Sequence, residues 1–235
     1  MDAEAQKRAA ARAAVELVED GMTLGLGTGS TVRWFILALE ELVQRGMRLQ
    51  GVATSRESER LATEAGVPLI ELDAGGLDLA VDGADVVDPE LRLIKGGGGA
   101  HVREKIVAAA ARRFVVVVDS AKLKPMLAGA LPVEVVPFGL GATLHSLSQL
   151  GAPFELRRDA SGAPAISDNG NVLADGKYDN IERAEELAEQ IDAVPGVVGQ
   201  GLFLGMTDVV LAAHEDGRIE RLEPPRDAGR VAQRH

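Results

Sequence analysis

The chain has 235 residues, 46% of them hydrophobic and 26% charged, which is typical of a folded globular protein and excludes the fibrous and disordered classes. Its length allows one large α/β domain or a main domain that carries a smaller one. A formal net charge of −11 argues against a basic surface for nucleic acid, and the absence of cysteine excludes disulfides and thiolate metal sites.

The N-terminal segment, residues 1–19, carries charges throughout and lacks the apolar core of a signal peptide. No apolar run in the chain approaches the length of a membrane span. We therefore expect a cytoplasmic protein with neither a membrane partner nor a nucleic-acid partner.

The first half of the chain alternates between short apolar runs and amphipathic segments. Residues 3–19 place Ala10, Ala14 and Leu17 on one stripe, which predicts a helix. Further helices are expected at 31–45, 55–65 and 102–112, and strands at 23–26, 49–53, 69–72, 77–81 and 114–118. This alternation predicts a parallel sheet, and the last of these strands is apolar on both faces, as in a strand covered on both sides.

The order of elements changes after Gly129. Strands are expected at 133–136, 154–157, near 165 and 172, and at 197–202, with helices at 142–150 and 180–191. The resulting order, strand-helix-strand-strand-helix-strand, is that of a ferredoxin-like unit. Apolar runs at 208–213 and 218–222 could return to the first sheet, which would make the second domain an insertion.

The first glycine-rich stretch, residues 25–31, lies between a predicted strand and a predicted helix. Free amides and the helix dipole favour an anion at such a position, and Ser30 and Thr31 add hydroxyl donors. The glycine spacing differs from the dinucleotide fingerprint, and no P-loop lysine follows. The alternative is a tight turn in which Ser30 only caps the helix, and this stretch alone does not separate the two.

Charged residues follow two of the predicted strands. Asp82 and Asp85 come after the strand at 77–81, at the edge where open α/β sheets bind ligands. Taken alone, an Asp beside Gly more often shapes a turn. Lys122 follows the strand at 114–118, so it is either a site residue at the same edge or a surface lysine.

The most informative stretch covers residues 94–105. Four successive glycines, 96–99, indicate backbone that approaches something closely or adopts unusual dihedral angles. Lys95 places a positive charge before them. Glu104 lies near the start of the next helix, where it faces either a ligand crevice or solvent. His101 is expected to cap the helix or to pack.

Together these stretches offer a phosphate cradle, several carboxylates and two lysines at the ends of neighbouring strands, and the sequence shows no cluster of metal ligands. Such a set suits proton transfer beside a carbonyl. That reaction needs one carboxylate base and a cation near the developing enediolate oxygen.

On these motifs, the sequence resembles the ribose-5-phosphate isomerase A family along its whole length. The matching stretches are 25–31, 81–85, 95–105, 119–122, 131–135, 167–171 and 195–198. Two departures are small: Val86 stands where many members carry an acid, and four glycines follow Lys95 where some members have three. Neither removes a catalytic group.

The resemblance implies an aldose-ketose isomerase of the pentose phosphate pathway that interconverts D-ribose 5-phosphate and D-ribulose 5-phosphate through a cis-enediol, with no metal and no cofactor. It implies that Glu104 moves the proton between C2 and C1, that Asp82 and Asp85 help to open the furanose ring, and that Lys95 stabilises the enediolate. The implied substrate-binding residues are Thr28, Gly29, Ser30, Thr31, Gly83, Ala84, Gly96, Gly97, Gly98, Lys122 and Lys7.

The resemblance also implies the domain organisation. We expect an α/β fold in which a Rossmann-like parallel-sheet domain, residues 1–128 plus 206–223, carries a smaller inserted α+β ferredoxin-like (βαββαβ) domain, residues 129–205. A loosely ordered tail is expected at 224–235. The expected assembly is a homodimer or a dimer of dimers.

Two alternatives come from other functional classes. A non-catalytic sugar-phosphate sensor is one, because effector domains of some transcription regulators resemble this fold, but we expect no room for a DNA-binding head before the first strand. A related enzyme, such as a sugar-phosphate deaminase or a CoA transferase, would share the phosphate-binding turn. Lys95, the glycine run and Glu104 disfavour it, and the glycine spacing disfavours a nucleotide-dependent dehydrogenase.

Overall fold

The computed structural model describes residues 1–224, which form two compact units. Unit 1 contains Met1–Ala84, Arg103–Leu123 and the chain from Gly205, and unit 2 contains Asp85–Val102 and Lys124–Leu204. Apart from its first residue, the tail expected at 224–235 lies outside the described residues. Among the described residues, no helix is long and apolar enough to cross a membrane.

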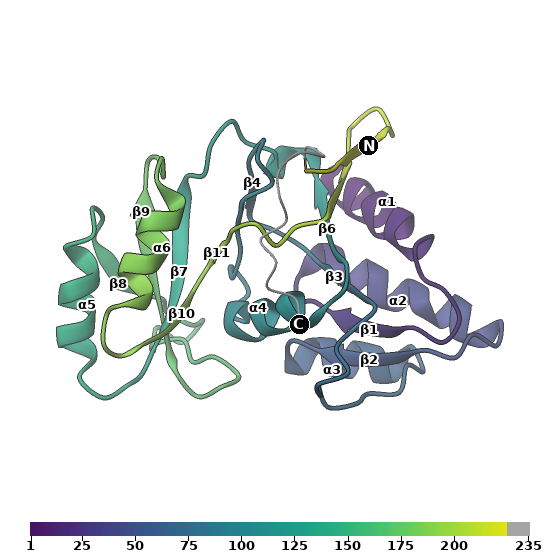
Figure 1. Ribbon diagram of the computed structural model, residues 1–235, viewed down its shortest axis with the longest axis horizontal. Helices are drawn as coiled ribbons and strands as arrows, with labels where there is room; N and C mark the ends of the chain where they lie inside the picture. The colour runs from purple at the N-terminus through teal and green to yellow at the C-terminus, as the bar shows by residue number, and fades with distance from the viewer. Residues whose placement is uncertain (225–235) are drawn as a thin grey trace. The chain divides into compact units, whose positions relative to one another are not determined.

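Unit 1 is built on a six-stranded sheet with the order β13-β12-β6-β3-β1-β2 (Figure 1). Its strands are β1 (Thr23–Leu26), β2 (Gln50–Ala53), β3 (Leu79–Asp82), β6 (Phe114–Asp119), β12 (Val209–Ala213) and β13 (Ile219–Leu222). All neighbours pair in parallel except β12 and β13. The predicted α/β class with a parallel sheet is therefore confirmed, and the carboxyl ends of β1, β2, β3 and β6 share one edge.

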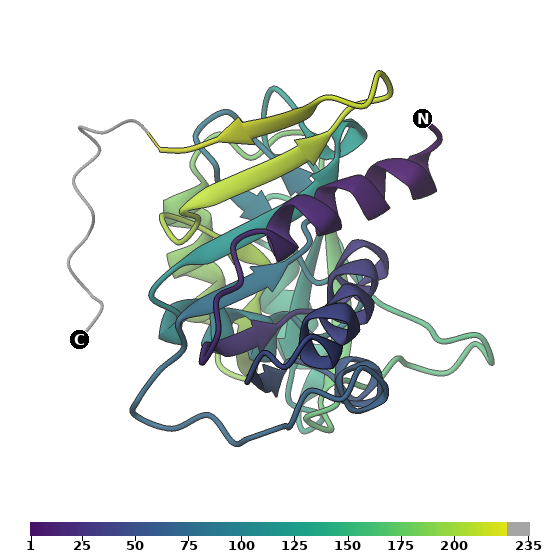
Figure 2. The ribbon, with the colours of Figure 1, turned by 90° about the vertical axis from the view of Figure 1, so that its right-hand side faces the viewer.

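Helices cover both faces of this sheet. One face is covered by α1 (Ala3–Val15), α2 (Ser30–Gln44) and α3 (Arg56–Glu64). These helices form an apolar core with the strand side chains that point to this face, among them Leu24 and Leu26. Figures 1 and 2 show α1 and α2 side by side over this face. Helix α4 (His101–Ala110) packs on the opposite face. The helix and the sheet are in close contact at Gly25, where an added Cβ would lie only 2.5 Å from Val107 Cγ1.

Unit 2 contains a four-stranded antiparallel sheet with the order β10-β7-β9-β8. Its elements follow one another as β7 (Gly129–Val135), α5 (Leu140–Ser148), β8 (Phe154–Leu156), β9 (Val172–Tyr178), α6 (Ala184–Asp192) and β10 (Val197–Gln200). Residues of β7 alternate between faces, so that Leu131, Val133 and Val135 join the apolar core with α5 and α6. Pro132 and Glu134 point to the other face.

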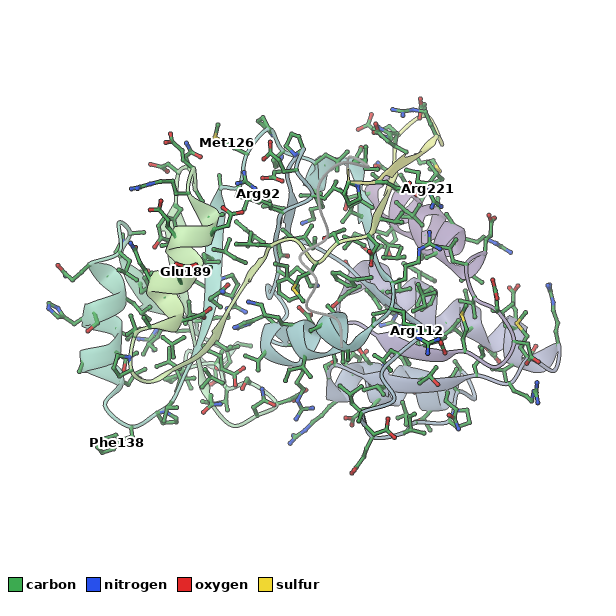
Figure 3. All side chains as sticks on the ribbon, viewed as in Figure 1. Arg92, Arg112, Met126, Phe138, Glu189 and Arg221 are labelled. Atoms are coloured by element: carbon green, nitrogen blue, oxygen red, sulfur yellow. The ribbon has the colours of Figure 1, made fainter. Side chains whose placement is uncertain are left out.

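Three strands of two residues each form a small antiparallel sheet in unit 2, with the order β11-β5-β4. They are β4 (Val86–Val87), β5 (Leu93–Ile94) and β11 (Leu202–Phe203). The turn between β4 and β5 is held by the buried Asp88, whose Oδ2 accepts from Arg92 Nε at 2.7 Å, and Arg92 is labelled in Figure 3. This hairpin leads directly into Lys95.

Some expected elements are absent or displaced. The strand expected at 69–72 is wrong: only Leu69 bridges to Gly51, and Leu69 and Ile70 are 38% and 37% exposed. The helix expected at 180–191 begins only at Ala184, because Ile181 N donates to Leu127 O at 2.8 Å and is held outside a helical turn.

Candidate functional site

The predicted site residues fall into two groups, one in each unit. In unit 1, the chain leaves β1 through Gly27 and Thr28 and enters α2 at Ser30. Gly29 is the N-cap residue, with φ 123°, and no side chain caps the helix. The interpretation of Ser30 as the cap is therefore wrong, because Ser30 is already the first helical residue. The start of α2 therefore has uncapped backbone amides. Amides of this kind at a helix N-terminus commonly bind anions in proteins.

Asp82 holds this turn in place from the neighbouring strand β3. Its carboxylate is buried, and Oδ1 accepts from Thr28 N at 3.0 Å and from Gly83 N at 2.7 Å. The two strand ends meet so closely that a Cβ at Gly27 would lie 2.2 Å from Asp82 Cγ. Asp82 therefore shapes its own turn, as expected of an Asp beside Gly, through the bond from Gly83 N. Its bond from Thr28 N also connects the end of β3 to the turn before α2.

A cluster of buried hydroxyls supports the same turn from the end of β2. Thr28 Oγ1 lies 2.7 Å from Thr54 Oγ1 and donates to Ser55 Oγ at 2.8 Å, while Ser58 Oγ donates to Gly27 O at 2.5 Å. Thr54, Ser55 and Ser58 are all buried. These three residues were not predicted from the sequence, although three hydroxyl side chains in the five positions after a predicted strand were a usable signal.

Glu104 lies on the α4 face that packs against the sheet. It is three residues before Val107, which contacts the sheet at Gly25, so the two side chains share one face of the helix. The other end of α4 is tied to the amino edge of β3, because Leu77 N donates to Ala110 O at 3.0 Å. Glu104 therefore lies toward the carboxyl edge of the sheet, on the face to which Asp82 alternates. It is only 3% exposed.

The two lysines predicted in unit 1 flank the end of β6. Lys122 ends the short 3₁₀ helix η1 (Ser120–Lys122) and is partly buried. Lys7 lies on α1, where its Nζ is 3.5 Å from Glu4 Oε2. Helix α1 meets η1 at the preceding residue, since Ser120 Oγ donates to Gln6 Oε1 at 3.3 Å. Lys7, one of the predicted substrate-binding residues, is thus engaged in an ion pair.

Unit 2 contains the rest of the predicted residues: Asp85 directly before β4, and Lys95, Gly96, Gly97 and Gly98 in the loop after β5. Lys95 is 2% exposed, and its Nζ lies 5.2 Å from the centroid of the Phe203 ring, a distance at which a cation interacts with the ring face. Its backbone N donates to Gly201 O at 2.9 Å. Asp85 Oδ2 accepts from Gly97 N at 2.8 Å, which brings two predicted residues together.

His101 is fully buried, and its Nε2 lies 3.3 Å from Gly199 O, so the expectation of a packing residue is confirmed. Within residues 1–224, no group of three or more His, Asp or Glu residues could hold a metal ion.

Comparison with known proteins identifies the family. The family model described as Ribose 5-phosphate isomerase A (phosphoriboisomerase A) matches residues 50–217. The chain is 48% identical to a Ribose-5-phosphate isomerase A of Roseiflexus sp. (strain RS-1), over 95% of this chain and 98% of that protein. The chain belongs to the ribose 5-phosphate isomerase A family.

Other members of the family are similar over nearly their full length. A Ribose-5-phosphate isomerase A of Gloeobacter violaceus is 48% identical over 95% of this chain and 98% of its own. The solved structure of ribose 5-phosphate isomerase A from Methanocaldococcus jannaschii is 41% identical, with a TM-score of 0.89 over 94% of this chain and 99% of that one. A D-ribose-5-phosphate isomerase solved in complex with phospho-erythronic acid is 39% identical, with a TM-score of 0.91 over 95% and 100%.

Proposed function

We propose that this chain interconverts D-ribose 5-phosphate and D-ribulose 5-phosphate through a cis-enediol. The observation that carries the proposal is the 48% identity, over 95% of the chain, to a protein named for this activity. A second observation supports a sugar-phosphate ligand: a relative 39% identical is solved in complex with phospho-erythronic acid, a phosphorylated sugar acid.

We assign Glu104 as the base that takes the proton from C2 of the open-chain aldose and returns it to C1. Its burial supports this role, because a carboxylate withdrawn from water is a more effective base toward a carbon acid. Lys95 would stabilise the enediolate oxygen. Its burial beside Phe203 supports this role, because a lysine that served only to keep the surface hydrated would be exposed to solvent. Asp82 and Asp85 would orient the sugar hydroxyls and assist ring opening.

The phosphate would bind at the start of α2. Gly29, Ser30 and Thr31 offer the amides of an uncapped helix, and the hydroxyls of Ser30 and Thr31 add donors. Lys122 and Lys7 would supply positive charge, and Thr28, Gly83, Ala84, Gly96, Gly97 and Gly98 would complete the substrate contacts. Local donors of this kind allow an acidic protein to hold an anion against its overall field.

We also propose a fold assignment for each unit. The parallel sheet of unit 1 supports a Rossmann-like domain. The element order of unit 2 from β7 to β10, with the sheet order β10-β7-β9-β8, supports a ferredoxin-like unit inserted into it. The domain limits at 1–128 plus 206–223 and at 129–205 stay predictions. So do the cytoplasmic location and the homodimer or dimer of dimers.

The test is formation of ribulose 5-phosphate from ribose 5-phosphate by the purified protein with EDTA present. Turnover that is unchanged by the chelator is expected for a metal-independent isomerase. Binding of ribose 5-phosphate without isomerisation would instead favour the sensor, and activity lost with EDTA and restored by a divalent cation would contradict metal independence.

The hydroxyl cluster gives a prediction about substrate affinity. Replacing Thr54 with valine keeps the side-chain volume and removes the bonds to Thr28 Oγ1 and Leu26 O. We expect KM for ribose 5-phosphate to rise about two- to tenfold, the effect of one or two lost hydrogen bonds on the phosphate-binding turn, while kcat changes less. The matched control is Thr63→Val, which removes an exposed bond to Glu59 O within α3 and should leave KM unchanged. Equal KM values for both variants would contradict the role of the cluster.

A further inference from the structure

Arg157 makes an unusual set of contacts at the end of β8. Its Nε donates to Asp175 Oδ2 at 2.8 Å and its Nη2 donates to Asp175 Oδ1 at 2.5 Å, which is a bidentate pair. Its remaining terminal nitrogen, Nη1, donates to Gly96 O at 2.9 Å and to Gly97 O at 3.0 Å. One guanidinium therefore joins a carboxylate of the sheet to two successive carbonyls of the loop after Lys95.

Both partners of the pair are fixed in the sheet of unit 2. Arg157 N donates to Leu173 O at 2.9 Å, and its own carbonyl accepts from Ala165 N at 2.8 Å. Asp175 lies within β9, between β7 and β8. The side chains of both residues are about four-fifths buried, with 19% and 22% exposed. The guanidinium is thus held at a fixed position rather than free to follow the loop.

The loop that Arg157 holds needs such a support. Residues 96–99 are all glycine, and glycine has the largest backbone freedom of any residue. Gly96 adopts φ 102°, and a Cβ there would lie 2.8 Å from the His101 ring, so a stiffer residue does not fit. Arg157 donates to the carbonyl oxygen of Gly97, and Asp85 accepts from the N–H of the same residue at 2.8 Å. The Gly97 backbone is therefore held from both sides.

We propose that Arg157, oriented by Asp175, is a positioning residue that fixes the glycine loop and thereby the ammonium group of Lys95. In this proposal Arg157 acts through the loop, by its bonds to Gly96 O and Gly97 O. This inference rests on the proposed isomerase function for its kinetic consequence, but the ordering of the loop is independent of that function.

The expected kinetic effect follows from what Lys95 is assigned to do. A cation that stabilises an enediolate acts in the transition state, and a displacement of about 1 Å can cost on the order of a hundredfold in rate. Replacing Arg157 with methionine removes the donors and keeps an unbranched side chain. We expect kcat to fall about ten- to a hundredfold and KM to change less than about threefold.

The neighbouring arginine provides a matched control. Arg158 is exposed, and its Nη1 donates to Gly162 O at 2.8 Å within the adjacent turn. Arg158→Met should therefore keep the wild-type kcat. In a Lys95→Met background, Arg157→Met should lower kcat by less than about twofold, because the group that it positions is already gone.

Hydrogen exchange of the peptide that covers residues 95–101 measures the loop without any turnover. Arg157→Met should speed exchange there, and Arg158→Met should not. Unchanged kcat and unchanged exchange in Arg157→Met would overturn the proposal, as would an equal loss of kcat with and without Lys95. If Arg157→Met does not fold, Asp175→Asn decides, since it weakens the hold on the guanidinium and leaves Arg157 in place. A wild-type protein without isomerase activity would refute the proposed function, while the exchange result would still decide whether Arg157 orders the loop.

Discussion

Replacing Glu104 with glutamine is expected to lower kcat for ribose 5-phosphate isomerisation by about a hundredfold or more. Glutamine has nearly the same shape as glutamate and fits the buried position on α4, but it cannot accept a proton from carbon. General-base catalysis contributes about 10²–10⁴ to a rate, so the loss of this single function accounts for the expected size. KM should change little, because the amide still fills the same space.

The measurement is the initial rate of ribulose 5-phosphate formation, with thermal unfolding of each variant measured alongside. Glu189→Gln is the matched control, since Glu189 is exposed on α6 (Figure 3) and the same change there should leave kcat as in the wild type. A Glu104→Gln variant that folds normally and retains more than about a tenth of the wild-type kcat would refute Glu104 as the base.

Replacing Gly27 with alanine is expected to have the largest effect on the turn between β1 and α2, which we propose binds the phosphate. The added Cβ would lie 2.2 Å from Asp82 Cγ and 2.6 Å from Asp82 Cβ, and Asp82 is buried, so the side chain has little room to withdraw. Overpacking of this kind costs about 1–3 kcal/mol in the free energy of unfolding. Movement of Asp82 would also break its bond to Thr28 N, and we expect KM for the sugar phosphate to rise at least about tenfold.

Urea unfolding and steady-state kinetics test this expectation together. Gly141→Ala is the control, because Gly141 lies in α5, has an ordinary backbone conformation and has no atom within 4 Å of an added Cβ. Alanine in a helix is favoured over glycine by about 0.5–1 kcal/mol, so the control should be as stable as the wild type or more stable. Equal stability and equal KM in Gly27→Ala and Gly141→Ala would show that the close approach of Gly27 to Asp82 matters neither for folding nor for substrate binding.

Several features of the fold follow from local patterns that the sequence displays directly. The alternation of apolar runs with amphipathic stripes predicts the parallel sheet of unit 1, because burial on one or both faces dictates where apolar residues recur. The all-apolar run 114–118 became β6, buried along its whole length in the middle of the sheet. The two-residue strands β4, β5 and β11 were not predicted, because two residues are too few to show an alternation of apolar and polar side chains.

The candidate site was predicted as a set of residues, and its internal connections were not. The motifs place Thr28 near the end of one strand and Asp82 near the end of another, but only the adjacency of β1 and β3 lets Asp82 accept from Thr28 N, 54 residues away. The alternative in which Ser30 caps the helix was wrong for a related reason. A serine at that position is a common cap, whereas the observed Gly29 N-cap depends on the φ that the turn imposes.

Local patterns in the sequence were enough to predict the family and the α/β class and to propose residues for the site, because glycine runs, strand-end acids and apolar periods are properties of neighbouring residues in the chain. Which side chains hydrogen-bond to which backbone groups depended on the tertiary structure. The hydroxyls of Thr54, Ser55 and Ser58 beneath the α2 turn were not foreseen, nor was the guanidinium of Arg157 against Gly96 O, 61 residues away. These contacts depend on strand order and register, which bring distant residues within hydrogen-bond distance, and no local pattern encodes that distance.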